Sequence, residues 1–95
     1  MNFKIIATVP TSYQLQSLRA FGLPVNKLGN GSFYSEQEFD EKEDAVNFLI
    51  SRAEAYYDGN SDNDEERLAE AIDRINKYNS IFLDAAHASI EEINI

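Results

Sequence analysis

A chain of 95 residues with 43% hydrophobic residues, no cysteine and a net charge of −9 is sized for one domain and excludes disulfides and cysteine-based zinc sites. Residues 1–35 hold three bases and no acid, whereas residues 36–73 hold 14 acids and three bases, a net charge of −11. This excess argues against direct nucleic-acid binding, because phosphate contacts need lysine and arginine, and it favours a basic partner.

The N-terminal third predicts a strand, a short helix and a hairpin. Residues 3–9 alternate between two faces, one of them entirely apolar, which predicts a central strand. Thr11 with Gln14 three residues later has the pattern of a capping box, and Gly22 is a suitable end for the helix that follows. The Gly-Asn-Gly segment at 29–31 is typical of a tight turn between two extended segments.

The second extended segment, residues 32–39, separates two phenylalanines on one face from Tyr34, Glu36 and Glu38 on the other. The alternation predicts a strand with one face towards the core and one acidic face towards solvent.

Two longer helices are predicted next. Asp40 with Glu43 three residues later indicates a helix N-terminus, and apolar positions at helical spacing follow it, with Leu49 among the inward residues. Gly59 fits the position just beyond the end of this helix. A further helix is expected from about residue 64 to 78, and its surface offers two ion pairs at i,i+4 spacing: Glu70–Arg74 and Asp73–Lys77.

The C-terminal tail is compatible with both a strand and a helix. Residues 80–83 can alternate in a strand, whereas the alanines after Asp84 also suit a helix capped by that residue. We expect a strand for the first half, since the sheet would otherwise be thin with an exposed edge, and leave residues 84–93 open. The order is then β-α-β-β-α-α-β over a single α+β domain, residues 1–95: a ferredoxin-like arrangement with a small antiparallel sheet and helices on one face.

The segment that begins at Asp58 has part of an EF-hand pattern, because Asp58, Asn60 and Asp62 alternate as oxygen ligands do in a calcium loop. The position of the loop glycine holds Asn63, and Ala69 stands where the bidentate acid belongs. We therefore expect a solvated connection that leads into a helix, without a bound metal.

Catalysis has two candidates, a carboxylate pair and one histidine. Glu36 and Glu38 point to the same side of one strand, but paired catalytic carboxylates also need a cleft, and a domain this small offers little of one. His87 is the only histidine, and it has neither partner ligands nor a nucleophile pattern nearby. We expect no enzyme and no cofactor.

The remaining signal is an acidic surface with tyrosines as anchors, and carboxylates spaced along helices and strands can take the place of phosphates before a nucleic-acid-binding groove. The residues expected to contact a partner are acidic or aromatic: Tyr34, Glu36, Glu38, Asp44, Glu54, Tyr57, Asp58, Asp62, Asp64, Glu66, Glu70 and Asp73.

In size, charge and absence of cysteine the chain resembles small acidic phage proteins that block restriction or CRISPR enzymes. The resemblance implies a non-enzymatic inhibitor that occupies a basic nucleic-acid-binding site of a partner protein in the host cytoplasm. No apolar run is long enough for a membrane span and no signal-peptide layout is present, so we expect a cytoplasmic protein with no membrane contact. The alternative is a small oligomeric regulatory or ligand-binding bacterial domain, with a homodimer as the candidate oligomer, whose acidity serves solubility only.

Overall fold

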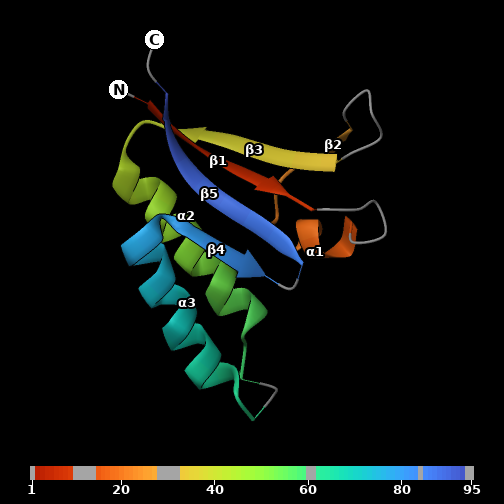
Figure 1. Ribbon diagram of the computed structural model, residues 1–95, viewed down its shortest axis with the longest axis vertical. Coiled ribbons are helices and arrows are strands. Elements are labelled where there is room, and N and C mark those ends of the chain that lie inside the picture. The colour runs from red at the N-terminus through yellow and green to blue at the C-terminus, as the bar shows by residue number, and fades with distance from the viewer. Residues whose placement is uncertain (1, 10–14, 28–32, 60–61, 84, 94–95) are drawn as a thin grey trace.

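The computed structural model describes residues 2–9, 15–27, 33–59, 62–83 and 85–93, and within them the chain forms an α+β domain with an antiparallel sheet, as expected (Figure 1). The elements follow in chain order: β1 (Asn2–Thr8), α1 (Leu15–Arg19), β2 (Asn26–Lys27), β3 (Phe33–Phe39), α2 (Lys42–Tyr56), α3 (Asp64–Tyr78), β4 (Ser80–Leu83) and β5 (Ala86–Ile93).

Among the described residues the sheet has five strands in the order β2-β3-β1-β5-β4, and every neighbouring pair is antiparallel. Strand β1 is central, as its pattern predicted, and pairs with β3 on one side and with β5 on the other. Its apolar face is buried, because Ile5 and Ala7 are both 0% exposed. The predicted hairpin is present as β2 and β3, while its turn at 29–31 and the capping box of Thr11 and Gln14 lie outside the described residues.

The C-terminal tail forms two strands instead of one. The strand expected at 80–83 is confirmed as β4, and the open question about residues 84–93 is answered by β5, although Asp84 itself lies outside the described residues. Ala86 and Ala88 are fully buried in β5, where small side chains allow helices to pack close to the sheet. Pairing of β5 with β1 thus outweighs the helical preference of alanine.

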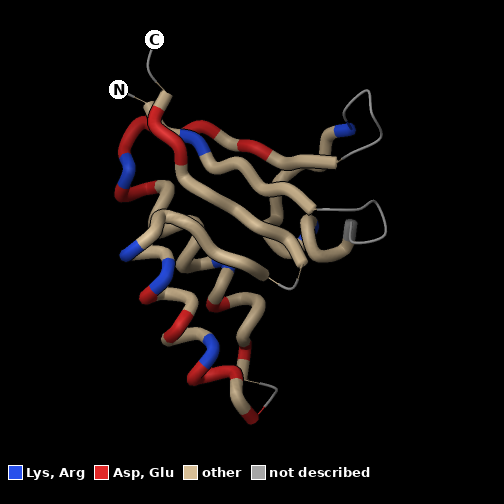
Figure 2. The backbone as a smooth tube through the Cα atoms, in the orientation of Figure 1, with Lys and Arg blue, Asp and Glu red and all other residues tan. Residues whose placement is uncertain are grey.

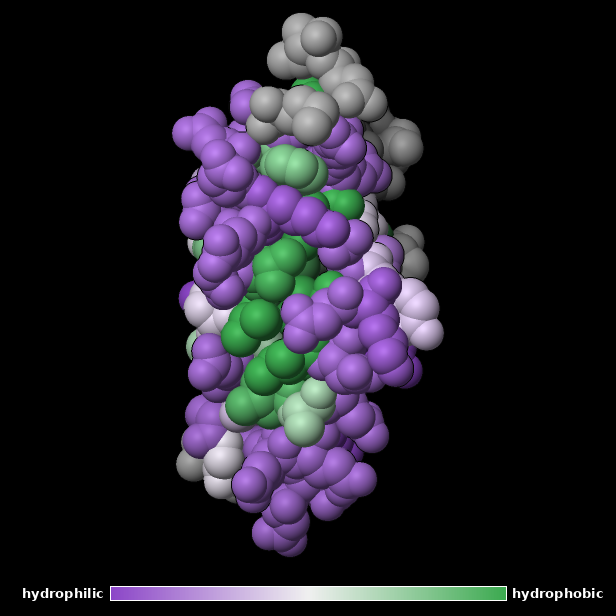
Figure 3. Space-filling view, turned by 90° about the vertical axis from the view of Figure 1, so that its left-hand side faces the viewer, coloured by the Kyte–Doolittle hydropathy of each residue, from purple (hydrophilic) through white to green (hydrophobic). Residues whose placement is uncertain are grey.

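The helices pack as a layer against the sheet. Helix α2 packs on β1, β3, β4 and β5, α1 packs on β3 and β5, and α3 packs on α2 and β4 at one edge of the sheet (Figure 1). The helix predicted from about residue 64 to 78 has those bounds. Figure 3 shows an apolar strip between hydrophilic flanks on the side where α2 and α3 meet, and half-buried Val46, Ile50, Leu68 and Ile72 belong to these two helices.

Both predicted ends of α2 were shifted. The helix begins at Lys42 after Glu41, whose extended backbone (φ −118°, ψ 141°) makes it the N-cap, so the predicted cap at Asp40 was wrong. Tyr57 is the C-cap and donates its N–H to the carbonyl of Ala53, so Gly59 lies one residue further on than predicted. Gly59 has φ +90°, and its role is in the connection to α3.

Arg52 of α2 fixes the end of α1. Its guanidinium donates two hydrogen bonds, of 3.2 and 3.1 Å, to the carbonyl of Ala20. Gly22 follows with φ +68°, and a Cβ there would lie 3.0 Å from Cζ of Arg52, which explains why this turn needs glycine. No helix among the described residues is long and apolar enough to cross a membrane.

Replacement of Leu49 by alanine should lower the free energy of unfolding by about 2–5 kcal/mol, because Leu49 is fully buried in the core between α2 and the sheet. Urea denaturation measures the change. The matched control is Asn47→Ala, an exposed position on the same helix, which should change stability by less than about 0.5 kcal/mol. A loss for Leu49→Ala no greater than that of the control would contradict the assigned core.

Candidate functional site

One face of the sheet has no described helix packed across it, and Figure 1 views the sheet from this side with α2 behind it. Residues opposite each other in antiparallel strands share a face, so the strand register defines its members. We call it the open sheet face, and it is formed by three rows across β3, β1 and β5: Glu38–Lys4–Glu91, Glu36–Ile6–Ser89 and Tyr34–Thr8–His87.

The open sheet face is acidic at one end. Glu36, Glu38 and Glu91 are exposed, and the face carries one base beside them, Lys4, whose Nζ lies 3.9 Å from Oε2 of Glu36. Strand geometry spaces Glu36 and Glu38 by about 7 Å along β3, and it separates Glu38 from Glu91 by about 10 Å, because β1 lies between their strands. Neither Glu36 nor Glu38 is enclosed, so the pair lacks the apolar pocket that catalytic carboxylates use.

The acidic surface extends to the N-terminus of α2. Figure 2 shows acidic residues gathered where β3 ends, α2 begins and β5 approaches the N-terminus. We call these residues, all exposed, together with the glutamates of the open sheet face the acidic sheet end: Glu36, Glu38, Asp40, Glu41, Glu43, Asp44, Glu91 and Glu92. Lys4 and Lys42 are the bases in the same segments, so eight acids outnumber two bases.

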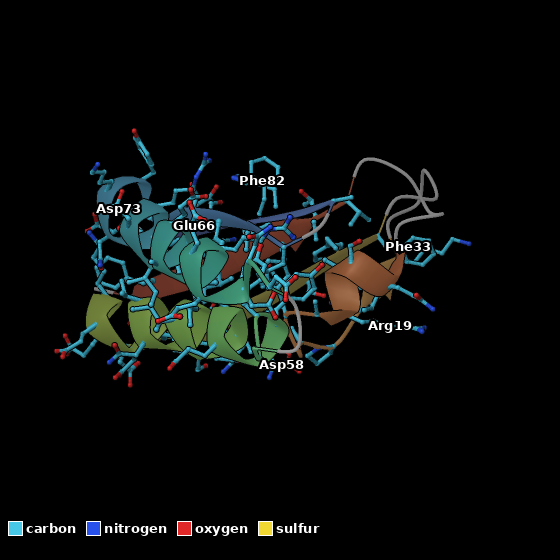
Figure 4. All side chains as sticks on the ribbon, turned by 90° about the horizontal axis from the view of Figure 1, so that it is seen from below. Arg19, Phe33, Asp58, Glu66, Asp73 and Phe82 are labelled. Atoms are coloured by element: carbon cyan, nitrogen blue, oxygen red, sulfur yellow. The ribbon has the colours of Figure 1, made fainter. Side chains whose placement is uncertain are left out.

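Aromatic and aliphatic side chains complete the open sheet face. Tyr34 and Ile6 are half-buried, and Phe82 of β4 is 56% exposed. The ring of Phe82 lies 4.5 Å from the ring of His87, centroid to centroid, so His87 supports an exposed aromatic group. Figure 4 shows Phe82 projecting from the side of the sheet opposite α2.

The residues predicted to bind a partner lie in three places: the open sheet face with the start of α2, the C-terminal half of α2, and the connection to α3 with α3 itself. Tyr34, Glu36 and Glu38 lie on the open sheet face, and Asp44 adjoins them at the start of α2. Glu54 is exposed on α2, and Tyr57 is half-buried at its C-terminal end. We call the remaining exposed acids the α3 ridge: Asp58, Asp62, Glu66, Glu70 and Asp73.

Asp64 is not available to a partner, because it is only 6% exposed. One of its carboxylate oxygens accepts a hydrogen bond of 3.1 Å from the N–H of Gly59, which closes the connection between α2 and α3. The calcium-like pattern that includes Asp58 and Asp62 therefore surrounds a structural carboxylate, and Asn60 lies outside the described residues. In the described ranges no three histidine or acidic residues are grouped as metal ligands.

Sequence reasoning missed Ile6, Phe82, Glu91 and Glu92 as surface residues of interest. Glu91 and Glu92 lie in β5, which was not identified as a strand, so their approach to Glu38 was not foreseen. The alternation of Ala86, Ala88 and Ile90 with more polar neighbours was the available signal.

A pocket of about 450 Å³ lies between α3, β4 and the C-terminal end of α2. Its charged lining residues are Arg67, Glu70 and Arg74, all from α3. The predicted pair Asp73–Lys77 is present at 3.2 Å, whereas the predicted pair Glu70–Arg74 is not formed among the described residues, and both of its members border the pocket. We call it the α3–β4 pocket.

No family model, no curated protein and no solved structure matches this chain. Its function is therefore inferred from the charge and geometry of the open sheet face, the α3 ridge and the α3–β4 pocket.

Asp64→Ala should destabilise the protein by about 1–3 kcal/mol, because it leaves the N–H of Gly59 without its carboxylate acceptor. Asp62→Ala is the matched control: it removes the same charge from an exposed position in the same connection and should change stability by less than about 0.5 kcal/mol. Equal urea midpoints for the two variants would show that the carboxylate of Asp64 does not hold the connection.

Proposed function

We propose that the protein is a small non-enzymatic binding or inhibitor protein of the phage anti-restriction or anti-CRISPR type. Its acidic sheet end and open sheet face occupy a basic, nucleic-acid-binding site of a partner protein, and it acts in the cytoplasm. The single observation that carries the proposal is the unpacked sheet face, on which exposed glutamates of β3 and β5 flank β1.

The geometry of this face supports a partner that binds nucleic acid. A sheet presents its side chains from a rigid, nearly flat backbone, so the carboxylates hold fixed positions, as the phosphates of a nucleic acid do. A basic groove that neutralises phosphates meets similar charges here, and steering by opposite charges raises the association rate. Tyr34, Ile6 and Phe82 lie on the same face and supply apolar contact area that slows dissociation.

The acidic sheet end supports the proposal better than the α3 ridge does. On α3 the exposed acids alternate with Arg67, Arg74 and Lys77, and one of them, Asp73, is already paired with Lys77. Mixed charge of this kind is common on solvated helices. At the acidic sheet end eight acids meet two bases, which leaves a stronger field for a basic partner.

The ferredoxin-like arrangement expected from the sequence also remains a proposal. Its support is that β1 and β2, joined through α1, are separated in the sheet by β3, while β3 and β5, joined through α2, α3 and β4, are separated by β1. These are two split β-α-β units. In this interpretation β4 is an additional edge strand, added beyond β5.

A second candidate function is a ligand-binding regulatory domain, in which acidity serves solubility only. One observation favours it, the α3–β4 pocket, whose volume of about 450 Å³ falls within the range of small-molecule sites.

Charge reversal tests the proposal. The triple variant Glu36→Lys, Glu38→Lys, Glu91→Lys should lose its partner, whereas the matched triple variant Asp58→Lys, Asp62→Lys, Glu66→Lys on the α3 ridge should retain it. The native protein and the two variants are used to capture proteins from a bacterial lysate at low and high salt, and the captured proteins are identified. The ability of the native protein and of each variant to displace labelled DNA or RNA from a captured protein is then measured. The native protein should displace nucleic acid, less so at high salt because screening weakens charge steering.

Circular dichroism should show that both triple variants remain folded, since all six positions are exposed. Equal displacement by the native protein and by the sheet variant would contradict the proposal, as would loss of displacement in the ridge variant alone.

A further inference from the structure

We propose that the α3–β4 pocket binds a small ligand that combines a planar aromatic ring with a phosphate group, in the manner of a mononucleotide. The inference is separate from the acidic sheet end and rests on the residues that line this pocket.

Two arginines whose charge is not used within the fold converge on the pocket. In the described part of the chain, Lys77 pairs with Asp73, Lys4 pairs with Glu36, and Arg52 holds the end of α1. The side chains of Arg67 and Arg74 have no ion pair or hydrogen bond there, although acids outnumber bases 17 to 8 in the sequence. Arg19, Lys27 and Lys42 also form no ion pair among the described residues, so the distinctive feature of Arg67 and Arg74 is that both border one pocket.

The helix places these two guanidinium groups so that they share one ligand. Arg67 and Arg74 are seven residues apart, which is two turns on one face of α3 and about 10 Å along its axis. Ala71 lies between them, and its small methyl group leaves room for a ligand over the helix. Guanidinium groups bind phosphate oxygens in a bidentate way and are always charged, so two of them suit a dianion.

Aromatic side chains form the remaining walls. Tyr56 and Tyr57 at the end of α2 pack edge to face with ring centroids 4.9 Å apart, and both line the pocket. Ile81 of β4 contributes the apolar floor, whereas the neighbouring Phe82 borders the pocket at its rim and directs its ring to the open sheet face beside His87. Exposed rings that are held in place are stacking surfaces for a planar heterocycle.

Glu70 narrows the ligand class further. It lies between the arginines along α3 and lines the same pocket, so the lining carries two positive charges and one negative charge. Glu70 reduces the attraction of the lining for a simple anion, whereas a nucleotide also offers hydroxyl and amine donors that the carboxylate accepts. The overall charge of −9 does not exclude an anion here, since exposed charges beyond about 8 Å are largely screened at physiological salt.

The test is a nuclear magnetic resonance titration of the full chain with three probes: adenosine monophosphate, adenosine and inorganic phosphate. Adenosine monophosphate should produce saturable shifts of the Arg67 and Arg74 side-chain signals. It should bind at least tenfold more tightly than either of the other probes, because only it uses both the arginines and the aromatic walls.

The double variant Arg67→Gln, Arg74→Gln should weaken this binding at least tenfold. The control Lys77→Gln removes a positive charge from the same helix outside the pocket and should leave the affinity unchanged within a factor of two. Both changes are at exposed positions, and amide spectra report whether the variants remain folded.

Three results would overturn the proposal: no saturable shift with adenosine monophosphate, equal affinity for inorganic phosphate alone, or unchanged affinity in the double arginine variant. The charge-reversed sheet variant Glu36→Lys, Glu38→Lys, Glu91→Lys should bind adenosine monophosphate as the native chain does. A negative result for ligand binding at the α3–β4 pocket therefore does not affect the proposed function of the sheet surface. Likewise, a negative result for the sheet surface does not affect the proposed ligand site.

Discussion

The hydrogen bonding of β1 on both of its edges is the constraint on which the rest of the structure depends. Through β3 it holds the N-terminal hairpin, and through β5 it holds the C-terminal hairpin that carries β4. The same strand divides the molecule into two sides. Ile5 and Ala7 point into the core under α2, whereas Ile6 points to the open sheet face. Because side chains alternate along a strand, one burial pattern defines both the core and the candidate surface.

The charge distribution of the surface follows from this pairing. Glu38 and Glu91 are far apart in the sequence, yet each is paired in register with Lys4, so β1 brings both onto one face. One lysine between carboxylates reduces their repulsion and leaves the patch acidic. The α3 ridge has a different character, since bases alternate with its acids and two of those bases turn to the α3–β4 pocket. The acidic protein therefore presents two chemically distinct surfaces.

Local sequence patterns predicted those elements whose structure does not depend on contacts with distant parts of the chain. The alternation in β1, the helical period of α3 and the faces of β3 are such cases, and Tyr34, Glu36 and Glu38 lie on the side expected of them. The local pattern of β5 does not decide between strand and helix, because its alanines suit both, and pairing with β1 is a tertiary effect. The α3–β4 pocket forms only where three elements meet, so local sequence patterns do not reveal it. The i,i+4 spacing of Glu70 and Arg74 predicts an ion pair, whereas in the structure both residues line the pocket.

Helices cover one face of the sheet and leave the other open, and two adjacent isoleucines of β1 test this arrangement directly. Solvent relaxation by a soluble paramagnetic agent, measured on methyl signals of the free protein, compares Ile5 with Ile6 on opposite faces of one strand. We expect strong relaxation of the Ile6 methyl signals and of the Phe82 ring, with Ile5 and Ile81 protected. Protection of Ile6 and Phe82 equal to that of Ile5 would contradict it, because the open sheet face would then be covered in solution.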